Sequence, residues 1–307
     1  MKAIINYLGQ YFYEVNKFVL SGTIITAALF IFLNYHFFID NTIEASPSLI
    51  SNFIYRYIIF FSAFVIPYCF VLFIGKGKSF VNKNFILLLL LAPAIFSLKT
   101  TLNFRFNISE NDDQNHFWEL VLYWPSLMVM IVLVLFMIRR IFHPNENFYG
   151  IKIKGIDWKP YWLMLLIMLP LIAAASTQND FLQMYPKMKM MSGFTHPENF
   201  GFWEKLLFEL AYGSDFISIE LFFRGFLVFG FVKWFGKDVI LPMALFYCTI
   251  HFGKPIGECI SSFFGGVLLG VVAYNTRSIL GGLIVHLGIA WLMELGGHIG
   301  NQLFRNG

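Results

Sequence analysis

The sequence predicts an all-α protein, a polytopic transmembrane helix bundle of eight or nine spans. Of the 307 residues, 58% are apolar and 13% are charged. That leaves too little polar surface to cover a soluble protein of this length. The chain also contains several apolar stretches of the roughly 20 residues that a helix needs to cross about 30 Å of hydrocarbon. Composition and stretch length therefore point to the same membrane fold.

The spans are predicted from apolar stretches in chain order. Long candidates cover residues 19–38, 53–75, 117–138, 216–232 and 259–274. Shorter or proline-interrupted candidates cover residues 85–98, 160–176, 239–251 and 279–296. We expect flanking residues, or burial between neighbouring helices, to complete the shorter ones.

Basic residues collect in alternate connections, as they do on the cytoplasmic side of a membrane. They precede the first span and follow the second, fourth, sixth and eighth: Lys2, Lys17, Lys76, Lys78, Lys83, Arg139, Arg140, Lys152, Lys154, Lys159, Lys233, Lys237 and Arg277. This alternation predicts a multi-pass protein of the plasma membrane, the bacterial inner membrane, with a cytoplasmic N-terminus. The net charge of +4 then reflects loop bias and predicts no nucleic acid partner. A glycine pattern for binding a nucleotide is also missing from the sequence.

The organisation changes near residue 200. Residues 1–200 are predicted to hold N-terminal transmembrane helices and an extramembrane loop, and residues 201–307 the functional core. The polar connection at 177–200 is expected to form an extracytoplasmic loop or a helix lying on the membrane surface. Beyond it the spans become richer in glycine and in polar groups.

Four ionisable side chains lie within the apolar segments of this core: Glu220, Arg224, His251 and His286. Charge at membrane depth costs roughly 2.5 to 3.5 kcal/mol per residue on insertion scales. Such groups therefore usually face a cavity and take part in chemistry. We expect the functional site among them.

On an α-helix, Glu220 and Arg224 would be one turn apart, about 6 Å along the axis, on the same face. One interpretation is a structural ion pair. The other is a catalytic carboxylate that acts on water, with Arg224 orienting it or tuning its pKa. Ser218 and Asp215 are interpreted as helix-end or solvent-facing residues.

The next two spans supply the imidazoles. Tyr247 precedes His251 by one turn, and Glu258 opens the following span. Glu258 is either a second carboxylate of the same cavity or a helix N-terminal acid that the positive end of the helix dipole stabilises. His286 lies deep in the last apolar helix, where a surface role does not explain it. Before it, the glycines at 266 and 270 have the spacing that lets helices pack closely.

The order of these residues resembles the CPBP family of intramembrane proteases, which includes CAAX prenyl endopeptidases and bacteriocin-processing proteins. The family pattern is Glu-Glu-x-x-x-Arg, then an aromatic residue-x-x-x-His, then His-x-x-x-Asn, on consecutive spans. Glu220 and Arg224 match the first motif, Tyr247 and His251 the second, and His286 the third. The resemblance covers residues 205–298.

The chain departs from this pattern at two positions. The family's first glutamate, which is usually assigned to activate the attacking water, is Ile219 here. The final asparagine, thought to help hold the oxyanion, is Ala290. The sequence is therefore either a branch in which Glu220 serves as the base, with Glu258 as a second carboxylate, or a relative that has lost hydrolysis.

The resemblance implies an intramembrane endopeptidase that cleaves a membrane-associated or lipidated peptide or protein, surrounded by membrane lipids. Glu220 would act as general base, and His251 and His286 would either hold a divalent ion or stabilise the oxyanion. Two imidazoles and a carboxylate suit Zn²⁺ with one open position. The family is described both as metal-dependent and as metal-free, so both mechanisms remain open.

Two other function classes use the same residues. The first is a catalytically inactive CPBP-like scaffold, chaperone or immunity protein that binds a peptide, lipid or helix. Ile219 and Ala290 favour this class, whereas the retained arginine and histidines oppose it. The second is a small secondary transporter that relays ions through the buried charges.

Overall fold

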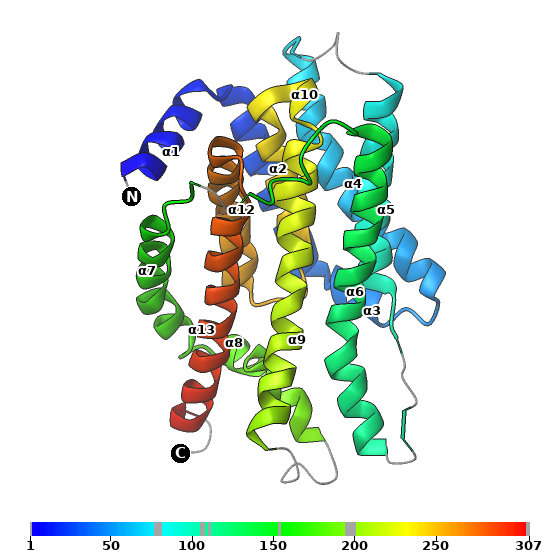
Figure 1. The fold of residues 1–307 in the computed structure, drawn as a ribbon, viewed down its shortest axis with the longest axis vertical. Helices are drawn as coiled ribbons and strands as arrows, with labels where there is room; N and C mark the ends of the chain where they lie inside the picture. Colours follow the sequence, from blue (N-terminus) through cyan, green and yellow to red (C-terminus); the bar gives the residue numbers. More distant parts are fainter. Residues whose placement is uncertain are drawn as a thin grey trace. The chain divides into compact units, whose positions relative to one another are not determined.

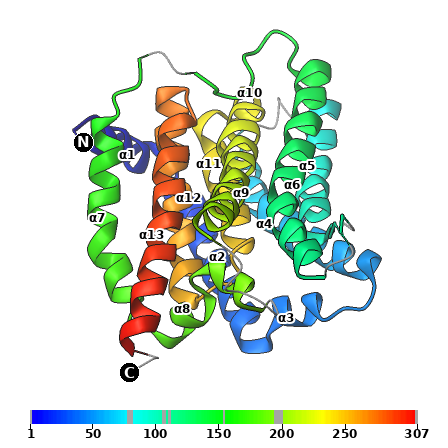
Figure 2. The same cartoon turned by 60° about the horizontal axis from the view of Figure 1, so that its bottom comes forward.

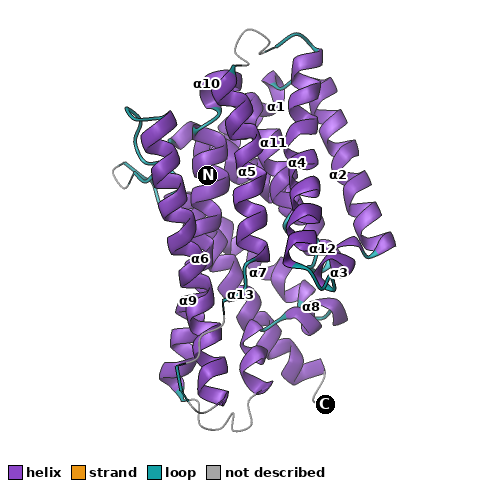
Figure 3. Cartoon of the chain, turned by 90° about the vertical axis from the view of Figure 1, so that its right-hand side faces the viewer, coloured by secondary structure: helices purple, strands orange, loops and turns teal. Residues whose placement is uncertain are grey.

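The computed structural model describes residues 2–76, 82–104, 108–109, 112–152, 155–193 and 201–304. Over these residues the regular structure is entirely helical, and no strand occurs (Figures 1 and 3). The prediction of an all-α fold is confirmed. Lys78, Lys154 and the end of the polar connection, residues 194–200, lie outside the described residues.

The chain forms two compact units, each assembled from separate segments. Unit 1 comprises Met1–Leu102, Val134–Ile156 and Leu221–Leu280. Unit 2 comprises Asn103–Leu133, Asp157–Glu220 and Gly281–Gly307. The domain boundary near residue 200 stays a prediction.

Unit 1 is built mainly of helices from the first third of the sequence and from residues 221–280. They are α1 (Lys2–Glu14), α2 (Lys17–Phe37), α3 (Ile39–Glu44), α4 (Leu49–Phe73), α5 (Lys83–Thr101), the π-helix η3 (Leu221–Phe229), α10 (Val232–Phe235), the 3-10 helix η4 (Gly236–Val239), α11 (Ile240–Thr249) and α12 (Ile256–Thr276). A short polar side chain starts three of them: Asn16 caps α2, Ser48 caps α4 and Asn82 caps α5. Each cap accepts hydrogen bonds from backbone N–H groups that the first turn leaves unpaired.

The ten-residue α11 forms the core of unit 1, and every one of its residues is buried. It packs against α2, α4, α12 and η3. The ring of Phe246 contacts aromatic rings from α4, α5 and η3: Phe60, Phe64, Phe96, Phe222 and Phe223. This aromatic packing explains how so short a helix is held in place.

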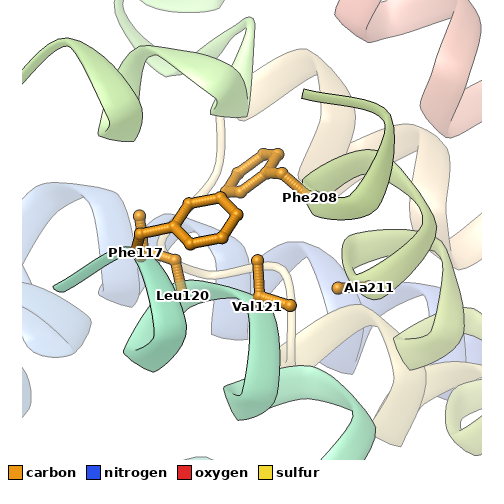
Figure 4. Packing of buried hydrophobic residues seen from close by; sticks show 5 residues of the cluster. All are labelled: Phe117, Leu120, Val121, Phe208 and Ala211. Carbon is orange, nitrogen blue, oxygen red and sulfur yellow. The ribbon is translucent and has the colours of Figure 1, made fainter. Parts of the chain in front are cut away.

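Unit 2 contains α7 (Lys159–Ala175), α8 (Asn179–Met184), the 3-10 helix η1 (Lys187–Gly193), α9 (Phe202–Glu220) and nearly all of α13 (Leu280–Phe304). It also contains the first two thirds of α6 (Asp112–Phe142), whose last turns belong to unit 1. Figure 4 shows how α6 and α9 meet, with Phe117, Leu120 and Val121 packed on Phe208 and Ala211.

Helices α7 and α13 lie side by side in unit 2, as Figures 1 and 2 show. Buried side chains of α7, α8 and the residue after it, Ile172, Phe181, Leu182 and Tyr185, pack with residues of α13. The polar connection thus begins as a helix that is anchored by apolar contacts.

Six described helices are long and apolar enough to cross a membrane: α2, α4, α5, α6, α12 and α13. Helix α7 is apolar but shorter. The prediction of a multi-pass membrane protein is confirmed, and the count of eight or nine spans stays a prediction. The stretches 216–232 and 239–251 do not form long α-helices, because the first becomes a π-helix at Leu221 and the second is ordered as α-helix only over Ile240–Thr249.

Candidate active site

The predicted site residues are divided between the two units. Glu220 and His286 belong to unit 2. Arg224, Tyr247, His251 and Glu258 belong to unit 1. The gathering of all of them around one cavity stays a prediction, and each half has a geometry of its own.

In unit 2, Glu220 and His286 form a direct polar contact between α9 and α13. The Nδ1 atom of His286 lies 2.8 Å from Glu220 Oε1. The Glu220 residue is fully buried, and the His286 side chain is 13% exposed. Because a carboxylate can only accept, Nδ1 carries the hydrogen and donates it to Glu220. The contact fixes the orientation of the His286 ring through Nδ1.

Phe216 supports this pair and was not predicted as a site residue. Its ring meets the His286 ring edge to face, with centroids 4.7 Å apart. Phe216 precedes Glu220 by four residues on α9, so both side chains lie on one face of that helix. The position of Phe216 could have been found from the sequence, since Phe216 precedes Glu220 by the same four-residue spacing that separates Glu220 from Arg224.

The two positions that depart from the CPBP pattern lie in one apolar cluster. Ala290 is buried together with Tyr212 and Phe216, and Ile219 packs against them. Leu283 and Leu287 of α13 complete this side of His286. Apolar side chains thus occupy both positions where the family pattern has polar ones.

In unit 1, Arg224 belongs to the π-helix η3, all of whose residues are buried. Its guanidinium carbon lies 3.9 Å from the centre of the Tyr247 ring. A guanidinium over an aromatic face gains a cation–π attraction, which is stronger away from water. The prediction of α-helical geometry through Arg224 is wrong, because the helix widens at Leu221. Its ion pair with Glu220 stays a prediction.

His251 lies two residues beyond the end of α11, on the turn that leads to α12. Its Nδ1 atom is 2.9 Å from the backbone oxygen of Tyr247, and the two rings meet edge to face at 4.7 Å. A carbonyl oxygen only accepts, so Nδ1 carries the hydrogen here too. In the neutral ring, Nε2 then holds the lone pair that accepts a proton or binds a metal.

Glu258 lies in the first turn of α12, where the positive end of the helix dipole stabilises a negative charge. Its Oε1 atom is 3.9 Å from Lys254 Nζ. This position agrees with the interpretation as a helix-end acid. Its role as a second catalytic carboxylate stays a prediction.

The segment that carries these residues was compared with known proteins. The family model of the Rce1-like type II CAAX prenyl endopeptidases matches residues 203–292. The resemblance to the CPBP family is confirmed over this segment. No curated protein and no solved structure matches the chain.

The Rce1-like segment begins in α9 and ends within α13. It therefore includes Glu220, Arg224, Tyr247, His251 and His286 on the elements that position them. This match supports a membrane endopeptidase with a protein or peptide substrate.

The donor groups of the Rce1-like segment can be compared with the ligands that zinc requires. Among the described residues no three His, Cys, Asp or Glu side chains are placed to hold a metal ion together. Glu220 and His286 supply two donors in unit 2, whereas a catalytic zinc takes three protein ligands. Zinc stays a prediction of the sequence, and the proposed mechanism uses side chains alone.

Proposed function

We propose that this protein is an intramembrane endopeptidase that hydrolyses a peptide bond of a membrane-associated or lipidated substrate. The observation that carries the proposal is the buried contact between Glu220 and His286 Nδ1 at 2.8 Å. A buried carboxylate is costly unless it is paired and used. The Rce1-like match supports the same chemistry.

In the proposed reaction, the Glu220 carboxylate takes a proton from water while the water oxygen attacks the peptide carbonyl carbon. The carbonyl oxygen becomes an oxyanion, which Nε2–H of a protonated His286 or His251 stabilises. Glu220 then returns the proton to the leaving nitrogen, and the C–N bond breaks. The products are a new carboxylate and an amine.

His286 is suited to this task because Glu220 already holds its other nitrogen. Arg224 is proposed to stabilise the helix geometry and the charge of Glu220, with its guanidinium placed by Tyr247.

The test is peptide cleavage by wild type, Glu220→Gln and His286→Ala in lipid nanodiscs. Both variants are expected to lose at least about 100-fold in kcat, since a positioned general base contributes roughly that much or more. His298→Ala is the matched control, because His298 is an exposed histidine three turns later on α13. Wild-type rates in Glu220→Gln would refute Glu220 as the base.

The same wild-type preparation tests the zinc prediction. Its metal content is measured by elemental analysis beside its activity. Full activity with far less than one zinc per chain would support the metal-free route. Activity that follows zinc content would require metal ligands in addition to Glu220 and His286.

The inactive scaffold is retained as a second candidate on one observation, the apolar cluster that contains Ile219 and Ala290. Both residues pack where the family pattern places polar groups, and in this alternative the protein binds a peptide, lipid or helix without hydrolysing it. Under this alternative the wild type would cleave no membrane peptide, whereas Ile219→Glu combined with Ala290→Asn would restore cleavage.

The predicted location belongs to the proposal as well. We infer a bacterial inner membrane with the N-terminus in the cytoplasm, supported by the alternation of Lys and Arg between connecting segments. Membrane lipids are then the immediate surroundings of the exposed apolar side chains, such as Trp162, Leu166 and Leu171 on α7.

A further inference from the structure

The turn that carries His251 is held by side chains from the first 60 residues of the chain, far outside the segment 203–292. After α11 ends at Thr249, residues 250–255 form a turn before α12 starts at Ile256. All of the residues concerned belong to unit 1. This turn determines where the His251 ring can lie.

Asn34, near the end of α2, is buried with 3% of its surface exposed. Its Nδ2 donates to the backbone oxygen of Phe252 at 3.0 Å, and its Oδ1 accepts from the backbone N–H of Asp40 at 3.0 Å. Both ends of the amide are used, so its orientation is fixed by chemistry. Beside it, the Tyr35 hydroxyl donates to the backbone oxygen of Lys254 at 2.6 Å.

These two hydrogen bonds hold the carbonyl groups on either side of Gly253, where a third residue comes close. A Cβ atom at position 253 would lie 2.6 Å from Asp40 Oδ2, so the Asp40 carboxylate would have to shift to make room for a side chain there. Asp40 is itself held, because its Oδ1 lies 3.1 Å from Arg56 Nη1. Arg56 in turn donates through Nε to Asn52 Oδ1 at 2.9 Å.

The arrangement is costly unless it has a task. A buried amide within a membrane helix is unfavourable unless it is hydrogen-bonded, and an apolar side chain would fill the same space without that cost. Here the amide is used to hold the turn next to His251. His251 is part of this turn, and its Nδ1 donates to the Tyr247 oxygen of α11. Side chains that restrain the turn therefore also restrain the imidazole.

We propose that Asn34 and Tyr35 are positioning residues for His251. They act through the backbone of residues 252–254, where they hold the carbonyl oxygens of Phe252 and Lys254. Their effect on cleavage rests on the proposed function, whereas their hold on the turn does not.

The test uses Tyr35→Phe and Asn34→Leu in the full chain in nanodiscs. Amide hydrogen exchange over residues 250–255, where every residue except Pro255 has an amide hydrogen, is expected to become faster in both, with exchange in the middle of α12 unchanged. With a membrane peptide, kcat is expected to fall about fivefold for Tyr35→Phe, which removes one hydrogen bond, with KM unchanged. Asn34→Leu, which removes two, is expected to lower kcat more. Tyr55→Phe is the control, because Tyr55 is 53% exposed on α4.

The outcomes separate the two proposals. Unchanged exchange over 250–255 in both variants would overturn the positioning role, and so would faster exchange with wild-type kcat. A wild type that cleaves no peptide would overturn the proposed function, while faster exchange in the variants would still support the hold of Asn34 and Tyr35 on the turn.

Discussion

At the scale of single residues, both imidazoles of the candidate site use the same nitrogen for orientation. His286 places Nδ1 on Glu220 Oε1, and His251 places Nδ1 on the Tyr247 oxygen. In each ring the contact at Nδ1 fixes the orientation of the imidazole. The two histidines differ in the group they contact, which is a carboxylate for His286 and a backbone carbonyl for His251.

Arg224 provides the residue-scale prediction. Arg224→Ala is expected to lower the free energy of unfolding by more than about 2 kcal/mol, because it removes a buried guanidinium and its contact with Tyr247. Thermal unfolding and the folded yield from gel filtration in detergent measure this loss.

A second cation–π contact supplies the control. Lys233 lies 4.3 Å from the centre of the Trp234 ring but is exposed. Lys233→Ala should cost less than about 1 kcal/mol. An equal loss in the two variants would contradict the importance of burial at Arg224.

At the scale of elements, the packing of α12 on α11 follows the predicted glycine spacing. A Cβ atom at Gly266 would lie 3.2 Å from Ala244 Cα and from Tyr247 Cδ1, and one at Gly270 would lie 2.5 Å from Met243 Cε. Both glycines therefore face α11, and the prediction of close helix packing is confirmed. This contact supports the helix that presents Tyr247.

Gly266→Val tests this contact. The added side chain should push α12 away from α11 and lower stability by about 1 to 3 kcal/mol, measured by thermal unfolding. Gly265→Val is the matched control, because it adds the same side chain one position earlier, where no atom lies within 4 Å of the new Cβ. Equal midpoints for the two variants would argue against close packing at Gly266.

At the scale of the whole molecule, the membrane class and the helices were predictable because apolar stretches and capping residues are local properties of the sequence. The candidate site residues Glu220, His251 and His286 were chosen from their spacing and order along the chain, and their shared role in catalysis stays a prediction. The π-helix was not predictable, because no local pattern marks Leu221–Phe229, and its residues Phe222 and Phe223 contact Phe96, which lies far earlier in the chain. The same holds for Asn34 and Tyr35, whose partners lie more than 200 residues away.

Stability should also depend on pH through His143, which follows α6 and is 2% exposed. Burial, with the nearby charge of Lys233, lowers the pKa of His143 from 6.5 to about 4. The unfolded chain therefore takes up this proton first as pH falls. The contribution of His143 to the free energy of unfolding is fully present above pH 6.5. About 3 kcal/mol of it is lost progressively as pH falls from 6.5 to 4.

Thermal midpoints between pH 8 and pH 4 measure this dependence in wild type and in His143→Gln. The variant cannot titrate at this position, so the difference between the two curves isolates His143. The Tyr149 hydroxyl, 3.0 Å from Nδ1, stays protonated throughout because burial raises its pKa. If the thermal midpoints of wild type and His143→Gln fall in parallel as pH decreases, His143 does not cause the loss of stability in acid.

The π-helix at Leu221–Phe229 makes the number of residues in this segment important for the position of Arg224. An α-helix turns about 100° per residue, and a π-helix accommodates extra residues within its turns. Deleting a single residue in this stretch would therefore tighten the wide turns and change which residues of Leu221–Phe229 share a helix face, even with every polar side chain retained. Spacing along this segment is thus as much a part of the chemistry as the identity of its arginine.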